Sequence, residues 1–285
     1  MLSGGRGDRT RFKGWTAGAK NVRNFFRAGA RCARRRSGLA TLALAAAIVT
    51  ALPAGLAPAR ADEPYLVVVN DAPPFRIIEN WGGDSGYAGA YIDTIFEIQR
   101  RTGIPLEFRH VPFARALAMM ENGAADIMLG PNWSVERAAY MVYLDASFPA
   151  ETKVFFAPDG GSDVESYQDL KSLRVGVLRA ARYFEPFDSD DTIQKITFDT
   201  YRSAFVAARQ GRVDVVIIPE RQGKYLLRQF GWSFTASSFR VPGTPSFITI
   251  SRKSNLIKKK AKIEDVMEQL NQEGFFARLL VTYLE

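Results

Sequence analysis

Two residue types that carry much of protein chemistry are almost missing from this sequence. Its 285 residues include one cysteine and one histidine. Cys32 precedes an apolar run near the start, so the chain after residue 61 has no cysteine and can form no disulfide, thiolate nucleophile or cysteine-bound metal site. His110 has no second histidine with which to hold a metal, and we expect it to be a rim or hydrogen-bonded residue rather than a catalytic one.

Recognisable catalytic and cofactor motifs are missing as well. The sequence has no Ser-His-Asp arrangement, no glycine-rich phosphate loop and no cluster of metal ligands. We therefore expect no metal and no cofactor. Any enzymatic activity would have to rest on isolated acidic residues.

The basic charge of the chain is confined to its start. The whole sequence has a net charge of +8, but residues 1–61 alone hold 12 Lys and Arg and a single acid, Asp8. The remaining residues are slightly acidic, with a net charge of −3. The basic excess therefore belongs to the leader, and the rest of the chain gives no indication of a nucleic-acid partner.

Residues 1–61 have the parts of a secretory signal peptide. A basic region ends at residues 34–36, an apolar run of 15 residues spans 38–52, and small residues at Ala59 and Ala61 precede a predicted cut before Asp62. The run is short for a bilayer span, which needs about 20 residues. We predict a cleaved leader and a periplasmic mature protein, with an uncleaved membrane anchor as the alternative and the export route, Sec or Tat, left open.

Strand-like and helix-like patterns alternate through the rest of the chain, which predicts an α/β fold with mostly parallel sheets. We expect residues 81–89 to form a glycine-rich loop, and Asp199 to cap a helix over 201–210. Further helices are expected over 90–102, 255–272 and 275–284, and strands over 66–69, 106–110, 127–129, 152–157, 173–178, 193–198, 213–218 and 247–251.

The segment 130–137, Gly-Pro-Asn-Trp-Ser-Val-Glu-Arg, carries most of the functional expectations. It follows a buried strand, and Ser134 is a good helix N-cap. A helix start offers free N–H groups and partial positive charge, which suit an anion. The positive charge of Arg137 is therefore unfavourable at this helix start by about 0.3–1 kcal/mol unless a negative charge lies near it. Either it points to solvent or pairs with Glu136 or Asp145, or its planar fork binds a ligand carboxylate with help from Ser134.

This motif, preceded by an Asp-apolar strand and followed by Tyr-Leu-Asp-Ala-Ser-Phe at residues 143–148, resembles the central motif of the family 3 extracellular solute-binding proteins. These are periplasmic receptors of ABC importers for polar amino acids. The resemblance runs from about Tyr65 to the C-terminus. It implies a type II periplasmic-binding fold in which Ser134 and Arg137 hold the carboxylate of the ligand, and we add Gly130 and Asn132 from the same segment to the predicted site.

The resemblance also implies a division of the chain into two lobes. We expect a signal peptide over 1–61, the first lobe over 62–150, the second over 151–245 and a return to the first over 246–285. Each lobe is expected to be a sheet flanked by helices. Two hinge strands near residues 150 and 245 are expected to join the lobes.

Other candidate ligand-binding residues come from the ends of predicted elements. Asp71 begins a rigid turn after the first strand, at the carboxyl end where open α/β sheets place ligands. Phe113 stands where the family commonly has an aromatic ring facing the cleft, although core packing explains it equally well. Arg182 lies in a turn, Ala-Ala-Arg, where amino-acid receptors of the family have ligand-binding hydroxyl groups.

The part of the family's site that binds an ammonium group differs in this chain. Pro219 occupies the position of the expected Asp, and Tyr91 replaces another acid. Glu220 either substitutes for the missing Asp or is solvated. The sequence thus predicts a carboxylated solute, either an amino acid or an organic acid.

The resulting hypothesis is a monomeric receptor that delivers this solute to the membrane permease of an ABC importer. A dehydratase-like enzyme on the same scaffold is one alternative, with Glu220, Asp71 and Glu151 as the candidate general acids. A sensor partner that presents its ligand to a membrane receptor is the other.

Overall fold

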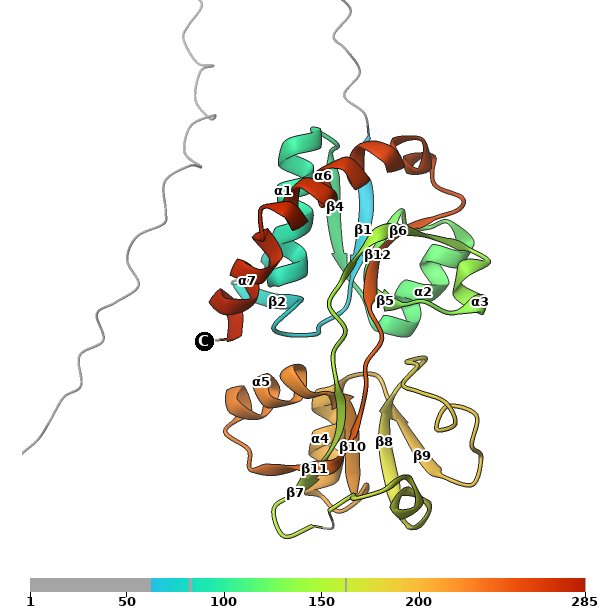
Figure 1. The fold of residues 1–285 in the computed structure, drawn as a ribbon, viewed down its shortest axis with the longest axis vertical. Helices are drawn as coiled ribbons and strands as arrows, with labels where there is room; N and C mark the ends of the chain where they lie inside the picture. The colour runs from blue at the N-terminus through green and yellow to red at the C-terminus, as the bar shows by residue number, and fades with distance from the viewer. Residues whose placement is uncertain (1–62, 82–83, 162, 285) are drawn as a thin grey trace, which may run out of the picture. The chain divides into compact units, whose positions relative to one another are not determined.

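Two five-stranded sheets organise the chain (Figure 1). The computed structural model describes residues 63–81, 84–161 and 163–284, so the predicted signal peptide lies outside the described residues. Among the helices that are described, none combines the length and the apolar character that a bilayer crossing requires.

The first sheet has the strand order β4-β1-β5-β12-β6. β1 pairs in parallel with β4 and β5, whereas β12 runs antiparallel to β5 and β6. The five strands are β1 (Tyr65–Val69), β4 (Leu106–His110), β5 (Ile127–Asn132), β6 (Met141–Phe148) and β12 (Ser246–Ser251).

The second sheet has the order β11-β7-β10-β8-β9. β8 pairs in parallel with β9 and β10, whereas β7 runs antiparallel to β10 and β11. The strands are β7 (Lys153–Pro158), β8 (Arg174–Leu178), β9 (Gln194–Phe198), β10 (Val215–Pro219) and β11 (Phe234–Val241).

The expectation of mostly parallel sheets is confirmed, and in each sheet one strand, β12 in the first and β7 in the second, runs against the other four. Each enters its sheet directly from the other one, at the edge where the parallel strands end. Lys153 at the start of β7 therefore pairs with Pro219 at the end of β10, and Ser246 at the start of β12 pairs with Asn132 at the end of β5. A strand that starts where its neighbours finish must run against them.

Helices cover both faces of the first sheet, because successive side chains of a strand point to opposite faces. Val67 and Val69 of β1 join the core under α1, α6 and α7, whereas Val68 joins the core under α2. Figure 1 shows α1, α6 and α7 on one side of this sheet and α2 on the other. These helices are α1 (Ala90–Thr102), α2 (Phe113–Asn122), α6 (Lys260–Gln272) and α7 (Phe275–Leu284).

The second sheet follows the same alternation. Phe156 of β7 packs with α4 (Tyr201–Arg209) and α5 (Glu220–Phe230). The preceding residue, Phe155, points to the other face and packs with Tyr183 and Phe187 from the loop after β8. Both halves therefore have their own apolar core, with the loop after β8 replacing a helix on one face.

Several local expectations are wrong or need new boundaries. The segment expected as a loop is mostly a hairpin, in which β2 (Ile77–Trp81) pairs antiparallel with β3 (Asp84–Ala88). The helix expected over 255–272 begins as a 3₁₀ turn, η2 (Asn255–Lys259), before α6. The cap of α4 is Thr200, whose hydroxyl accepts a hydrogen bond from the Ser203 amide at 3.1 Å. The helices expected over 90–102 and 275–284 are confirmed.

Two segments connect the sheets, one between β6 and β7 and one between β11 and β12 (Figure 1). Both meet the sheets at the strand ends described above. Polar residues on these ends are therefore brought close to the loops that follow β1, β5, β8 and β10.

Candidate functional site

Side chains from the ends of strands in both sheets surround two adjoining cavities that share part of their walls, and we call the pair the cleft. The shared walls are formed by Ala72, Arg76, Gly130, Asn132, Lys153, Pro219 and Gln222. The first half of the cleft adds Asn70, Phe113, Arg137, Leu178, Ala181, Arg182, Tyr183 and Tyr201, and the second half adds Phe75, Tyr91, Pro149, Glu151, Thr244 and Ser246.

Arg137 is buried in this cleft, with 5% of its surface exposed. It lies on the short helix α3 (Val135–Ala138), and its Nη1 and Nη2 atoms donate to the carbonyl oxygens of Asn132 at 3.0 Å and Ala180 at 2.9 Å. The guanidinium stands 5.6 Å from the centre of the Phe113 ring. Burial lowers the pKa of Arg137.

Arg137 neither points to solvent nor pairs with Glu136 or Asp145, the alternative that the sequence left open. Glu136 lies 3.9 Å from Arg182, and Asp145 lies 3.6 Å from Lys260, so these two acids face other cations. Both hydrogen bonds of the Arg137 guanidinium go to neutral carbonyl groups. Its charge is therefore not neutralised by either of the acids that the sequence offered as partners.

Arg76 is a second buried cation of the cleft, and the sequence-based prediction missed it. Its exposed fraction is 7%, and its Nε donates to the Asn70 carbonyl oxygen at 3.3 Å. The guanidinium stands 5.5 Å from the centre of the Tyr91 ring, a cation–π distance. Desolvation lowers the pKa of Arg76.

Gly130 makes the position of Arg76 possible. Its φ of +85° lies in the left-handed region, and a Cβ at this residue would stand 1.8 Å from Nη1 of Arg76. A side chain and this guanidinium cannot occupy the same space. The structure thus places Gly130 in the cleft as the residue that allows Arg76 to approach the backbone.

Lys153, the first residue of β7, is a third buried cation, and it was also missed. Its exposed fraction is 5%, and its Nζ has no hydrogen-bond partner among the described residues. Burial lowers the pKa of the Lys153 ammonium, while the charge of Asp188 acts in the opposite direction. An ammonium buried in this way is costly unless something else supplies an acceptor.

Three further predicted residues lie at the cleft. Asn132 ties β5 to the second connection, because its Nδ2 donates to the carbonyl oxygens of Thr244 and Pro245, both at 3.0 Å. Phe113 contributes its ring both to the wall of the cleft and to the core under α2. Arg182 lines the first half but is half-exposed, with 51% of its side chain accessible.

Ser134, Asp71 and Glu220 do not line the cleft. Ser134 caps α3, accepting a hydrogen bond from the Arg137 amide at 3.3 Å, and lines a shallower hollow beside the cleft. Asp71 is exposed. Glu220 bonds to Lys224 and Arg240, and its hydrogen bond with Arg240 lowers the pKa of its carboxyl group.

Among the residues that line the cleft, Glu151 is the sole acid. Its carboxylate accepts a hydrogen bond from Nη1 of Arg221 at 2.8 Å, and desolvation raises its pKa. Tyr91 stacks on Phe148 at 3.6 Å, and its hydroxyl lies 2.8 Å from that of Ser246; burial raises its pKa to about 12. The cleft is therefore lined by four cationic side chains and one carboxylate that is already paired.

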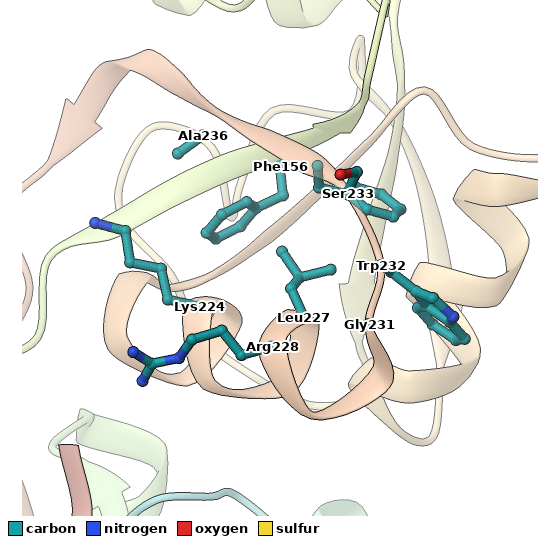
Figure 2. A pocket seen from close by; sticks show the side chains of 9 residues that line it. Phe156, Lys224, Leu227, Arg228, Gly231, Trp232, Ser233 and Ala236 are labelled. Atoms are coloured by element: carbon teal, nitrogen blue, oxygen red, sulfur yellow. The ribbon is translucent and has the colours of Figure 1, made fainter. Parts of the chain in front are cut away.

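A second, more open hollow lies within the second half of the chain alone. Its volume is about 450 Å³, and Figure 2 shows Leu227 of α5 between Phe156 and Trp232, with Lys224 and Arg228 extending from the helix. Lys224 is already paired with Glu220. This hollow lies at the opposite end of the second sheet from the carboxyl ends of its parallel strands, so the cleft is the better candidate for a ligand site. No three His, Cys, Asp or Glu side chains within the described part of the chain gather to hold a metal.

Two sheets joined by two connections, with buried polar side chains at the facing strand ends, form a two-lobed α/β protein with a polar cleft. The chain belongs to the bacterial extracellular solute-binding proteins, family 3, whose model matches residues 66–285. The resemblance noted in the sequence is therefore confirmed. No curated protein matches the sequence.

Solved structures with this fold share little sequence with the chain. An ancestral arginine-binding protein bound to arginine is 20% identical, with a TM-score of 0.68, over 78% of this chain and 98% of that one. An amino acid ABC transporter substrate-binding protein of Streptococcus pneumoniae, bound to L-arginine, is 17% identical with a TM-score of 0.68, over 78% and 94%. A histidine kinase sensor domain with similarity to periplasmic binding proteins is 18% identical with a TM-score of 0.63, over 78% and 96%. These similarities establish the two-lobed α/β fold.

Proposed function

We propose that the chain is a periplasmic receptor that captures a small carboxylated solute between its two lobes and delivers it to the permease of an ABC importer. Membership of an extracellular solute-binding family supports the general role. The proposal that the solute has a carboxylate rests on the burial of Arg137 in the cleft, where its guanidinium donates hydrogen bonds only to two carbonyl groups. A buried guanidinium in a cleft suits an anion that completes its hydrogen bonds.

Arg137 has donors left for this purpose. A guanidinium has five N–H groups in a fixed fork, and two of them are used in the bonds to Asn132 and Ala180. The Phe113 ring supports one face of the group. Three N–H groups therefore remain for a carboxylate, and two parallel hydrogen bonds to one carboxylate are the strongest arrangement for this pair.

The solute is either an amino acid or an organic acid. Glu220, which the sequence offered as a partner for an ammonium group, does not line the cleft, and neither does Asp71. Glu151 is bonded to Arg221. An α-amino acid must therefore share Glu151 with Arg221 or leave its ammonium to neutral acceptors. This cost favours organic acids at least as much as amino acids.

An enzymatic role has weaker support. Of the three candidate acids, Glu151 alone lines the cleft, and a general acid there would have to give up its bond to Arg221. The family is one of binding proteins. The proposed protein is monomeric, takes no metal or cofactor and has no nucleic-acid partner.

A thermal-shift screen tests the proposal. The exported protein is mixed with amino acids, dicarboxylates and aromatic acids, and each carboxylate is matched by its neutral amide. A bound ligand at 100 times its Kd should stabilise the folded state by about 2.7 kcal/mol, which is readily detected. Shifts with amides but with no carboxylate would contradict the proposal.

A further inference from the structure

The cleft contains more positive charge than one carboxylate can balance. Arg76, Arg137 and Lys153 are all buried there, and Glu151, the acid that lines the cleft, is paired with Arg221. Asp71 lies near Arg76 and Asp188 near Lys153, but neither acid forms an ion pair or hydrogen bond with its neighbour, so a solute with one carboxylate at Arg137 would leave both cations without a bonded anion. Removing a charged group from water without a partner is unfavourable, and a receptor that encloses such a solute would incur this cost at both Arg76 and Lys153.

Lys153 shows where the missing negative charge belongs. Its Nζ is buried and has no hydrogen-bond partner among the described residues, and its residue lines both halves of the cleft. An ammonium group has three donors, and no described residue accepts from this one, so its acceptors have to come from a bound solute or from water. The geometry of β7 holds Lys153 at the strand start, opposite Pro219.

Arg76 lies on the same shared wall, and its position depends on the backbone at Gly130. The absence of a side chain at Gly130 gives the guanidinium its space, and the Tyr91 ring lies beneath it at 5.5 Å. Its Nε is bonded to a neutral carbonyl oxygen, that of Asn70. Arg76 and Lys153 line both halves of the cleft, whereas Arg137 lines the first half only.

We propose that the solute carries two anionic groups, a carboxylate bound by Arg137 and a second carboxylate or phosphoryl group bound by Arg76 and Lys153. This inference rests on the proposed function and narrows its ligand class to dianions. It also separates the chain from neighbours whose bound ligand is arginine. A guanidinium on the ligand would lie near cations of like charge in a site of low dielectric, and this repulsion lowers the affinity for such a ligand.

A ligand series tests the proposal on the unaltered protein. Binding of glutarate, its monoamide, butyrate, 4-phosphonobutyrate and arginine is measured by calorimetry on the exported protein after removal of co-purified solute. We expect glutarate or the phosphonate to bind about 10- to 100-fold more tightly than the monoamide and butyrate, and arginine to bind weakest. The stronger of the two dianions identifies the second group.

A variant series tests the residues. In Lys153→Met, dianion affinity should fall about 10- to 100-fold, and by at least about threefold more than butyrate affinity, because the proposal assigns Lys153 to the second anionic group that butyrate lacks. Lys171→Met, at an exposed lysine of the same half of the chain, is the matched control and should change neither.

The outcomes separate this inference from the proposed function. Equal affinity of the wild-type protein for glutarate and butyrate would overturn the second anionic subsite while leaving carboxylate binding intact. Failure of every carboxylate and phosphonate to bind would overturn the proposed function itself. An equal loss of butyrate and glutarate affinity in Lys153→Met would show that Lys153 supports the cleft as a whole, against the assignment of a separate subsite.

Discussion

Gly130 shows how one residue without a side chain determines the chemistry of the cleft. Its backbone has a φ of +85°, and the Arg76 guanidinium occupies the position that a Cβ would take. The identity of Gly130 could be predicted as part of the site from its motif. Its role could not, because Arg76 belongs to a turn more than fifty residues earlier in the chain.

Replacing Gly130 by Ala should therefore displace Arg76 and weaken binding of the solute. We expect a loss of folding free energy of about 2–4 kcal/mol, the sum of left-handed strain and a steric clash in a packed site. Urea unfolding measures the loss. Gly160→Ala is the control: its φ is +79°, but a Cβ there meets nothing within 4 Å. The control should lose only about 1 kcal/mol, and equal losses at the two positions would contradict the steric role of Gly130.

Lys153 should lower the stability of the ligand-free protein. Its pKa is lower in the folded chain than in the unfolded chain, so the penalty is fully present below the folded pKa and is relieved as pH rises toward the unfolded value of about 10.4. Lys153→Met should therefore stabilise the free protein by about 1–3 kcal/mol at pH 7. The advantage should shrink at pH 10. Urea unfolding at both pH values checks this, and a destabilised variant at pH 7 would refute it.

The residues that sequence reasoning found and missed differ in how they are encoded. Gly130, Asn132 and Arg137, which line the cleft, belong to one contiguous motif, so their proximity follows from the local chain. Arg76 and Lys153 meet only because a turn of the first sheet and the first strand of the second face the same cleft. Glu220 was expected in the site because of its neighbour Pro219, but the direction in which its side chain extends depends on Lys224 and Arg240.

At the scale of elements, the start of α4 is stabilised by a capping hydrogen bond and not by a charged cap. Thr200 accepts from the Ser203 amide, whereas the expected cap, Asp199, pairs with Arg179 at 2.7 Å. Thr200→Ala should cost about 1 kcal/mol of folding free energy, and Asp199→Ala less than about 0.5 kcal/mol, because an exposed ion pair contributes little. Chemical denaturation of the two variants checks the order, and a larger loss for Asp199→Ala would reverse the assignment.

Most elements could be predicted because apolar periodicity and caps are local signals. The α1 and α7 boundaries agree with the expectation. The β2–β3 hairpin was missed because its glycine-rich, polar sequence shows no alternation of apolar residues. The direction of β7 and β12 could not be read locally, since it depends on which sheet each strand enters and from which edge.

At the scale of the whole molecule, the charge step at residue 61 predicts export and cleavage. N-terminal sequencing of protein recovered from the periplasm should begin at Asp62. The mature chain then has a net charge of −3, and it should stay in the aqueous fraction. Recovery of the intact chain with the membranes would contradict the cleaved leader and favour an anchor.

The central claim is that Arg137 binds the carboxylate of the solute in the cleft. The most direct measurement is calorimetry with the carboxylate that gives the largest thermal shift, on the wild-type protein and on Arg137→Ala. The variant should lose about 2–4 kcal/mol of binding free energy, a fall in affinity of about 30- to 1000-fold, while the amide of the same solute binds both proteins equally weakly. Equal carboxylate affinities for the wild type and Arg137→Ala would contradict the account.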